Sequence, residues 1–138
     1  MLSLYQNGIK NVICTFGTLI SPSLISYIVK LNPKNIIFSF NNDSNSKNNA
    51  GLSGCIKSFF KLISYIDYDK IKIVLPVKND FGDMDRNDFN QWEEKKEIAL
   101  SNFDYNKIVK HALEINSNQK QPQNFIKKIK NFQKQLEK

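Results

Sequence analysis

The sequence has few of the residues from which metal centres and catalytic dyads are often built. Its 138 residues include two cysteines, one histidine and one tryptophan. Cys14 and Cys55 are far apart and have no histidine at ligand spacing, which excludes a zinc site; both are expected to be small buried groups, reduced in a cytosol. His111 lies among apolar residues of an expected helix, which favours a packing or surface histidine over a catalytic base.

Glycine is also scarce, with five residues in the chain. No glycine-rich segment ends in Gly-Lys-Ser or Gly-Lys-Thr, which argues against an autonomous P-loop ATPase. The turn after the first expected strand, Phe16-Gly17-Thr18, contains a single glycine, so the fingerprint of a dinucleotide-binding domain is missing too. The sequence therefore lacks two common loops that bind phosphate through backbone amides.

Long hydrophobic runs are missing as well. No stretch approaches the roughly 20 apolar residues that cross a bilayer, and the first residues lack the basic region and cleavage site of a signal peptide. We therefore expect a soluble protein of the cytoplasm, or of the host cytoplasm if the source is viral, with no membrane partner. The hydrophobic content of 41% suits one modest domain followed by a tail.

The net charge of +7 is compatible with a polyanionic partner. Apart from Arg86 every basic residue is lysine, and abundant Lys, Asn and Ile are also what an A/T-rich genome encodes, so the total alone is weak evidence. The distribution is more informative: residues 1–76 carry +5, residues 77–104 carry −4 and residues 105–138 carry +6. An acidic segment between two basic ones suits carboxylates that hold cations beside surfaces that attract phosphate, and solvated helix faces would look similar.

The first half of the chain predicts alternating strands and helices. Apolar runs at 12–16, 36–40 and 71–75 predict strands. Ser21 is expected to cap a helix with Pro22 as its first residue, and both Ser21-Pro22 and Gly51 precede stripes of apolar residues at helical spacing. Continuous apolar strands indicate a parallel sheet of about three to four strands with helices on both faces, an α/β fold. The carboxyl ends of the strands should meet at one edge of the sheet.

The second half predicts helices without strands, and we divide the chain into an α/β domain at 1–85 and a helical C-terminal extension at 86–138. Asn87 or Asp88 is expected to cap one helix, with Trp92 in the core, and Asp104 to cap another. After a polar linker at 116–124, a narrow apolar stripe runs along a lysine-rich last helix. That stripe needs a surface to pack on, either this domain or an absent partner.

Acidic side chains follow two of the predicted strands. Asn41 and Asp43 come directly after 36–40, and Asp80 and Asp83 follow 71–75. Ligands of open α/β sheets bind at the carboxyl edge, and Mg²⁺ prefers oxygen ligands, often one or two carboxylates with waters and phosphate oxygens. A divalent-metal site for phosphate chemistry is therefore predicted, with Asp43 as its centre. The alternative is that these acids only cap the helices or turns that follow them.

The ordered segments 8–18, 36–43 and 75–84 resemble the TOPRIM domain of DNA primases, especially those of bacteriophages, over roughly residues 1–85. The resemblance implies a TOPRIM-like sheet in which Asn41 and Asp43 occupy the two positions of an Asp-x-Asp motif and Asp80 the later acidic position, with Asp83 nearby. It implies Mg²⁺ or Mn²⁺ as cofactor and Asp43 and Asp80 as catalytic residues. Lys78 becomes a candidate phosphate contact, a solvated lysine being the alternative.

Two positions differ from that family. Asn41 replaces the first Asp of the motif, and the strand that carries the family's essential Glu would precede Met1. We therefore expect either a truncated or split primase, or a degenerate TOPRIM domain that retains the fold. The function implied is synthesis of RNA primers from ribonucleotides on single-stranded DNA, with a replicative helicase or the missing part of the primase as partner. A non-catalytic nucleic-acid-binding or assembly module, and a TOPRIM nuclease or recombination protein, are the alternatives.

Overall fold

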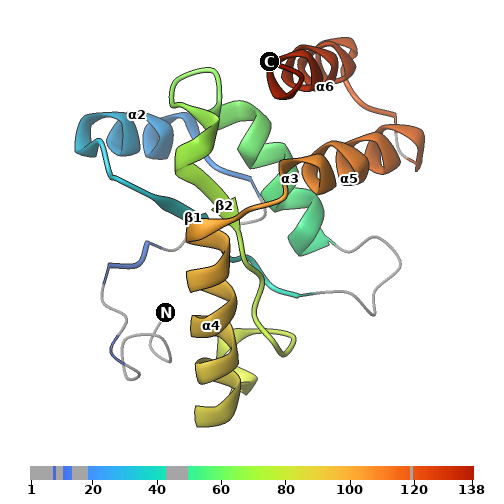
Figure 1. Ribbon diagram of the computed structural model, residues 1–138. Helices are drawn as coiled ribbons and strands as arrows, with labels where there is room; N and C mark the ends of the chain where they lie inside the picture. Colours follow the sequence, from blue (N-terminus) through green and yellow to red (C-terminus); the bar gives the residue numbers. More distant parts are fainter. Residues whose placement is uncertain (1–7, 9–10, 14–18, 43–49, 119) are drawn as a thin grey trace.

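The computed structural model describes residues 8, 11–13, 19–42, 50–118 and 120–138 (Figure 1). In chain order these form helix α2 (Pro22–Leu31), strand β1 (Ile36–Phe38), helix α3 (Ala50–Leu62), strand β2 (Ile71–Ile73), and helices α4 (Arg86–Ser101), α5 (Tyr105–Asn118) and α6 (Gln123–Leu136). Two short 3-10 turns, Tyr68–Lys70 and Phe81–Asp83, flank β2. The described chain is thus a mixed α/β structure.

The two strands pair in parallel, as their apolar runs predict. Ile36 lies opposite Ile71 and Phe38 opposite Ile73, and the backbone N–H of Val74 continues the ladder by donating to the carbonyl of Phe38 over 3.0 Å. Both strands are shorter than the predicted 36–40 and 71–75. Beyond them, the hydroxyl of Ser39 donates to the Val74 carbonyl, the acceptor that a longer β1 would use.

The rest of the predicted sheet is not described. Of the expected strand at 12–16, the structure describes only Val12 and Ile13, and neither is in a strand. Within the described residues the sheet therefore has two strands.

Helices cover both faces of these two strands. Ile36, Phe38 and Ile71 belong to the main core, which also contains residues of α2, α3, α5 and α6. Ile37 points to the other side, because successive side chains of a strand alternate, and it packs with Val74 in a second cluster formed with α4. The predicted coverage on both faces is confirmed for this part of the sheet.

Local signals set most of the helix ends. The Ser21 hydroxyl accepts from the backbone N–H of Leu24 at 3.2 Å, with Pro22 as the first helical residue, and α2 ends at Asn32 in a left-handed conformation, φ 48°. The Asp104 carboxylate accepts from the backbone N–H of Asn106 at 3.1 Å, just before α5 begins. Both predicted N-terminal caps are confirmed.

The predicted cap of α4 is wrong. Neither Asn87 nor Asp88 caps this helix; Asp85 does. Its carboxylate accepts from the backbone N–H of Asp88 at 2.9 Å, and the Asp88 carboxylate accepts from the N–H of Asp85 at 3.1 Å. This reciprocal capping box places Asp88 inside the first turn, where it is buried.

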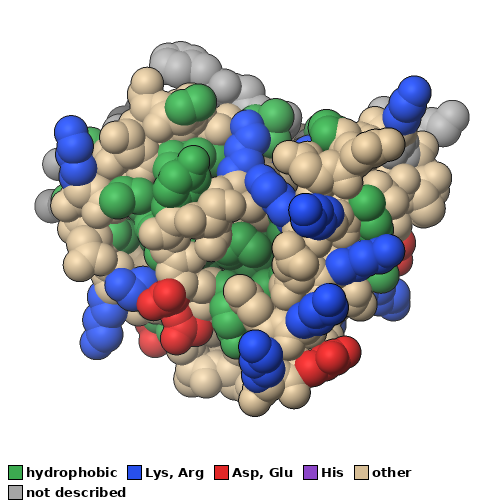
Figure 2. Space-filling view, turned by 90° about the horizontal axis from the view of Figure 1, so that it is seen from above, with side chains coloured by type: hydrophobic (Ala, Val, Ile, Leu, Met, Phe, Trp, Pro, Cys, Tyr) green, Lys and Arg blue, Asp and Glu red, His purple; other side chains and the backbone are tan. Residues whose placement is uncertain are grey.

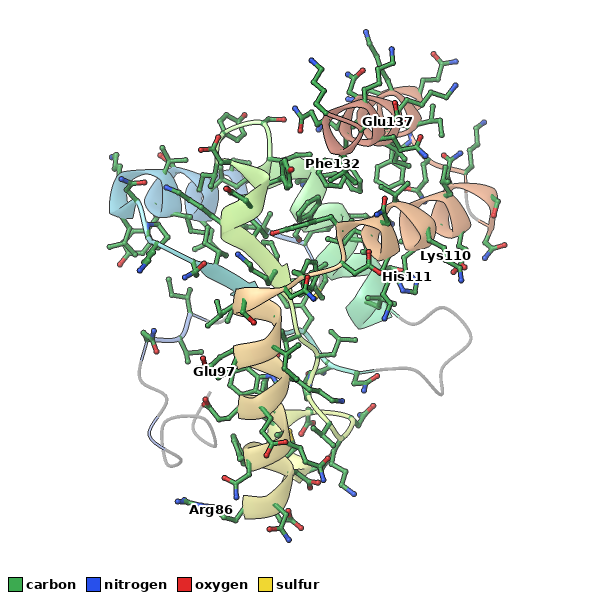
Figure 3. The ribbon with its side chains drawn as sticks, viewed as in Figure 1. Arg86, Glu97, Lys110, His111, Phe132 and Glu137 are labelled. Atoms are coloured by element: carbon green, nitrogen blue, oxygen red, sulfur yellow. The ribbon has the colours of Figure 1, made fainter. Side chains whose placement is uncertain are left out.

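The last helix packs on this same chain, which settles the two alternatives for its apolar stripe. Phe125, Ile129 and Phe132 are buried in the main core, and Phe132 points from α6 toward the helices beneath it (Figure 3). Its ring centroid lies 5.2 Å from that of Phe59 and 5.8 Å from that of Phe60. The linker is shorter than the predicted 116–124, since α5 reaches Asn118 and α6 begins at Gln123. The main core therefore contains residues from both sides of residue 85. The division of the chain into two domains at that residue stays a prediction.

Candidate functional site

Two hydrogen bonds join the segments that follow β1 and β2. The backbone N–H of Asn42 donates to the carbonyl of Asn79 over 2.7 Å, and the Asn42 side-chain amide donates to the carbonyl of Pro76 over 3.0 Å. Residues that are more than thirty positions apart thus meet at one edge of the sheet, as the parallel topology predicts. Asp43 and the predicted turn at Gly17 lie outside the described residues.

Asn41 lies at this edge, between the end of β1 and the start of α3. Asn41 is exposed, but its backbone carbonyl oxygen faces Gly51. A Cβ atom built on Gly51 would lie 1.7 Å from that oxygen. The side-chain amide of Asn41 is therefore the oxygen donor that this residue presents to a cation. Sequence reasoning used Gly51 only to mark a helix start; a glycine in the first turn of a helix is the signal of such a close approach.

Asp80 and Asp83 sit on the turn that follows β2. Asp80 has an extended backbone, and its Oδ1 accepts from the backbone N–H of Asp83 at 3.0 Å. The capping role that the sequence left open is thus present for Asp80. The same hydrogen bond fixes the orientation of its carboxylate, while Asp83 is exposed.

Phe81 anchors this acidic turn to α4. Its ring centroid lies 5.3 Å from that of Trp92, edge to face, and 6.0 Å from that of Phe89. Trp92 is buried, as predicted, and its indole N–H reaches both the Ser39 hydroxyl and the Val74 carbonyl at 3.2 Å. One side chain of α4 therefore connects the ends of both strands with the acidic turn. A buried indole N–H needs a hydrogen-bond acceptor, so a tryptophan predicted in the core already indicates that Trp92 bonds to a polar group of another segment.

The carboxylates at this edge have no cationic partner within the part of the chain that the structure describes. The ion pairs of the described residues lie on α4 and α5 instead. Lys96 pairs with Glu93 at 2.7 Å and, more weakly, with Glu97 at 3.9 Å. His111 lies 3.7 Å from Glu114 and pairs with it when the imidazole is protonated. Lys78 is exposed and belongs to none of them. Asp80 and Asp83 thus contribute negative charge that a bound cation would offset.

The donors at the edge suit a hard divalent cation. Asp80, Asp83 and the amide of Asn41 are all oxygen ligands, and Mg²⁺ commonly uses one or two carboxylates and keeps several waters. Among residues 8, 11–13, 19–42, 50–118 and 120–138, no cluster of three or more His, Cys, Asp or Glu side chains is positioned to hold a metal. The described residues thus offer oxygen donors of the kind that Mg²⁺ prefers, and a metal site at this edge stays a prediction.

The remaining reactive side chains lie away from this edge. Cys55 is buried in the main core, and burial raises the pKa of its thiol to about 12, as expected for a packing cysteine. Cys14 lies outside the described residues. His111, labelled in Figure 3, is partly exposed on α5, which agrees with the prediction of a packing or surface histidine.

Comparisons of the chain with protein-family models, with curated proteins and with solved structures give no match. Within the described residues, no helix is both long and apolar enough to span a bilayer.

Proposed function

We propose that this chain is a TOPRIM-like module of the DNA primase type, which holds Mg²⁺ or Mn²⁺ at the carboxyl edge of its sheet. The observation that carries the proposal is the pair of hydrogen bonds from Asn42 to Asn79 and Pro76. These bonds bring the segment that leads into Asp43 beside the segment from Lys78 to Asp80. The contact of Asn42 with this segment supports the proposal that Asp43 and Asp80 act together.

Each residue of the edge has a chemical role in this proposal. Asp43 and Asp80 are the catalytic carboxylates that hold the cation, and Asn41 and Asp83 add oxygen donors. The hydrogen bond from the Asp83 N–H keeps the Asp80 carboxylate oriented. A divalent cation in such a site supplies charge that stabilises a phosphoryl group during transfer. Lys78 is exposed and lies two residues before Asp80 in the same loop. Its ammonium group would contact a phosphate of the substrate.

The substrates follow from this chemistry. Ribonucleotides would be joined into a primer on a single-stranded DNA template, and a replicative helicase or another part of the primase would be the protein partner. The strongly basic segment 105–138 is compatible with a template strand near the site.

Metal titration tests the proposal. Mn²⁺ binding is measured by electron paramagnetic resonance for the parent and for Asp43→Asn, Asp80→Asn and Asp83→Asn. Asparagine still accepts a capping hydrogen bond, so Asp80→Asn should fold normally. We expect Asp43→Asn and Asp80→Asn each to weaken Mn²⁺ binding by about tenfold or more, because each removes a charged oxygen ligand.

Glu94→Gln is the matched control, since it removes the same charge from an exposed position on α4. It should leave the affinity for Mn²⁺ within about twofold. Parent-like binding by Asp80→Asn would overturn the metal site. Incorporation of labelled ribonucleotides on a single-stranded template then tests the primase reaction, which Asp80→Asn should abolish and Glu94→Gln should retain.

A further inference from the structure

Helix α6 has two sharply different faces. Phe125, Ile129 and Phe132 are buried, with Ile129 0% and Phe132 1% exposed. Lys127, Lys130 and Lys134 are exposed and follow the spacing i, i+3, i+7. At 3.6 residues per turn these three lysines share one stripe on the side opposite the buried one. Viewed from above, lysine side chains gather over this part of the molecule (Figure 2).

This lysine stripe carries uncompensated charge. Helix α6 contains four lysines and no acidic residue, and the first acid after it is Glu137, labelled in Figure 3. Within the residues that the structure describes, no lysine of α6 forms an ion pair. The face therefore attracts an anionic partner.

The burial of the apolar stripe decides what kind of partner fits. A basic amphipathic helix often inserts its apolar side into a membrane surface or into the groove of a partner protein. Here that side is already packed against α3 and α5, with Phe132 among the rings of Phe59 and Phe60. Only the polar face is available, so the interaction must depend on charge and on polar groups.

A hollow at the C-terminal end of α6 adds an exposed aromatic ring. It is lined by Gln135 and Lys138 and, from the loop after α3, by Tyr65, Asp67 and Asp69. Tyr65 is 66% exposed, unusually high for a large aromatic residue. The two carboxylates repel phosphate from the hollow but accept hydrogen bonds from base amino groups. The hollow thus suits a base, while the lysine stripe suits the backbone that carries it.

We propose that single-stranded DNA binds along the outer face of α6, with its phosphates on Lys127, Lys130 and Lys134 and one base stacked on Tyr65. A basic track combined with an aromatic platform is the usual way to bind single strands without sequence preference, because every base has a face that can stack. The choice of DNA over RNA rests on the proposed primase function. The binding surface itself does not depend on the metal site.

The lysine stripe is tested by fluorescence anisotropy with a labelled single-stranded DNA oligonucleotide, at several salt concentrations and in EDTA. The triple variant Lys127→Gln, Lys130→Gln, Lys134→Gln should bind about tenfold or more weakly and lower the slope of log affinity against log salt by about 2. The control, Lys30→Gln, Lys34→Gln, Lys95→Gln, removes three exposed lysines from other elements and should change affinity by less than about threefold. Equal losses in the two triple variants would overturn the proposal.

Tyr65 distinguishes a single strand from other polyanions. Tyr65→Ala should weaken binding of single-stranded DNA by about tenfold while leaving the salt slope unchanged, because stacking releases no counterions. Tyr27→Ala, which removes an exposed tyrosine of α2, should have no effect. Tighter binding of duplex DNA, of RNA of the same sequence or of anionic vesicles would contradict the proposal. Asp80→Asn should bind the strand normally, so a failed metal site and a failed strand site give different results.

Discussion

Gly51, in the first turn of α3, lies against the backbone carbonyl of Asn41 at the end of β1. A Cβ atom on Gly51 would be 1.7 Å from that oxygen and 2.8 Å from the carbonyl carbon, so any side chain here would displace backbone. This close approach fixes where the helix begins relative to the segment that follows the strand.

Replacing Gly51 by alanine should therefore reverse the usual effect of this substitution. In an ordinary helix position Gly→Ala stabilises by about 1 kcal/mol, whereas forced displacement in a packed region typically costs about 1–3 kcal/mol. We expect Gly51→Ala to lower the free energy of unfolding, measured by urea denaturation. Ala50→Gly, at the exposed preceding residue, should lower it by less than about 1 kcal/mol. A stabilised Gly51→Ala protein would show that the close approach does not exist.

The indole of Trp92 and the hydroxyl of Ser39 share an acceptor, the carbonyl of Val74. Trp92→Phe and Ser39→Ala should each destabilise the protein by about 1–2 kcal/mol, since each removes hydrogen bonds in a largely buried region. The double variant should differ from the sum by at least about 0.5 kcal/mol, because both side chains belong to one network.

The control for this cycle is Ser101→Ala. The hydroxyl of Ser101 bonds to carbonyls in the last turns of α4, at 3.1 Å and 3.3 Å, and contacts neither strand. Its effect should add to that of Trp92→Phe within about 0.3 kcal/mol. Additive effects of Ser39→Ala and Trp92→Phe would mean that α4 is not tied to the strand ends in this way.

Tyr105 should make the protein sensitive to alkaline pH. Burial, and then the charges of Asp69 and Tyr68, raise its pKa from 10.0 to about 12. The unfolded chain thus ionises first, so this tyrosine's contribution is complete below pH 10 and is lost as the pH rises toward 12. Its hydroxyl donates to the carbonyl of Ile71 over 3.1 Å, so Tyr105→Phe should lose about 1 kcal/mol at neutral pH.

The same variant should lose less stability than the parent between pH 10 and pH 12, as followed by urea denaturation across that range. The thiol of Cys55, whose pKa burial raises from 9.0 to about 12, destabilises both proteins equally in alkali and cancels in the comparison. Tyr27→Phe, at a residue that is 53% exposed, is the control for loss of a tyrosine hydroxyl and should cost less than about 0.5 kcal/mol at neutral pH. Identical pH profiles for Tyr105→Phe and the parent would contradict the burial of this hydroxyl.

The parts of the fold that could be predicted depend on short-range signals. Ser21-Pro22 and Asp104 mark helix starts through their own side chains. The apolar runs at 36–40 and 71–75 have few polar residues, so both faces of these strands were expected to be covered by helices. The start of α4 was misplaced because several acids in succession are competent caps. The reciprocal hydrogen bonds between Asp85 and Asp88 select Asp85, and the three-residue spacing of that pair was a local signal present in the sequence.

The candidate site was predictable to a similar degree. Parallel topology alone implied that the segments after β1 and β2 meet, but the bonds from Asn42 to Asn79 and Pro76 depend on the register of two loops. The sequence did not decide whether Asp80 is a metal ligand or the cap of the turn that follows it, because both roles use the same carboxylate. The stripe of Phe125, Ile129 and Phe132 was recognised from its period, and only the packing against α3 identified what it covers.

The position of Phe132 in the main core has a consequence for synthesis of the protein. Phe59 and Phe60 of α3 are 0% and 1% exposed, and Phe132, which is synthesised much later, is part of their cover. Until Phe132 has been added, the growing chain presents these two rings without that cover. The nascent protein therefore exposes an apolar aromatic surface between the synthesis of α3 and that of α6, and it is during this interval that a chaperone would recognise it.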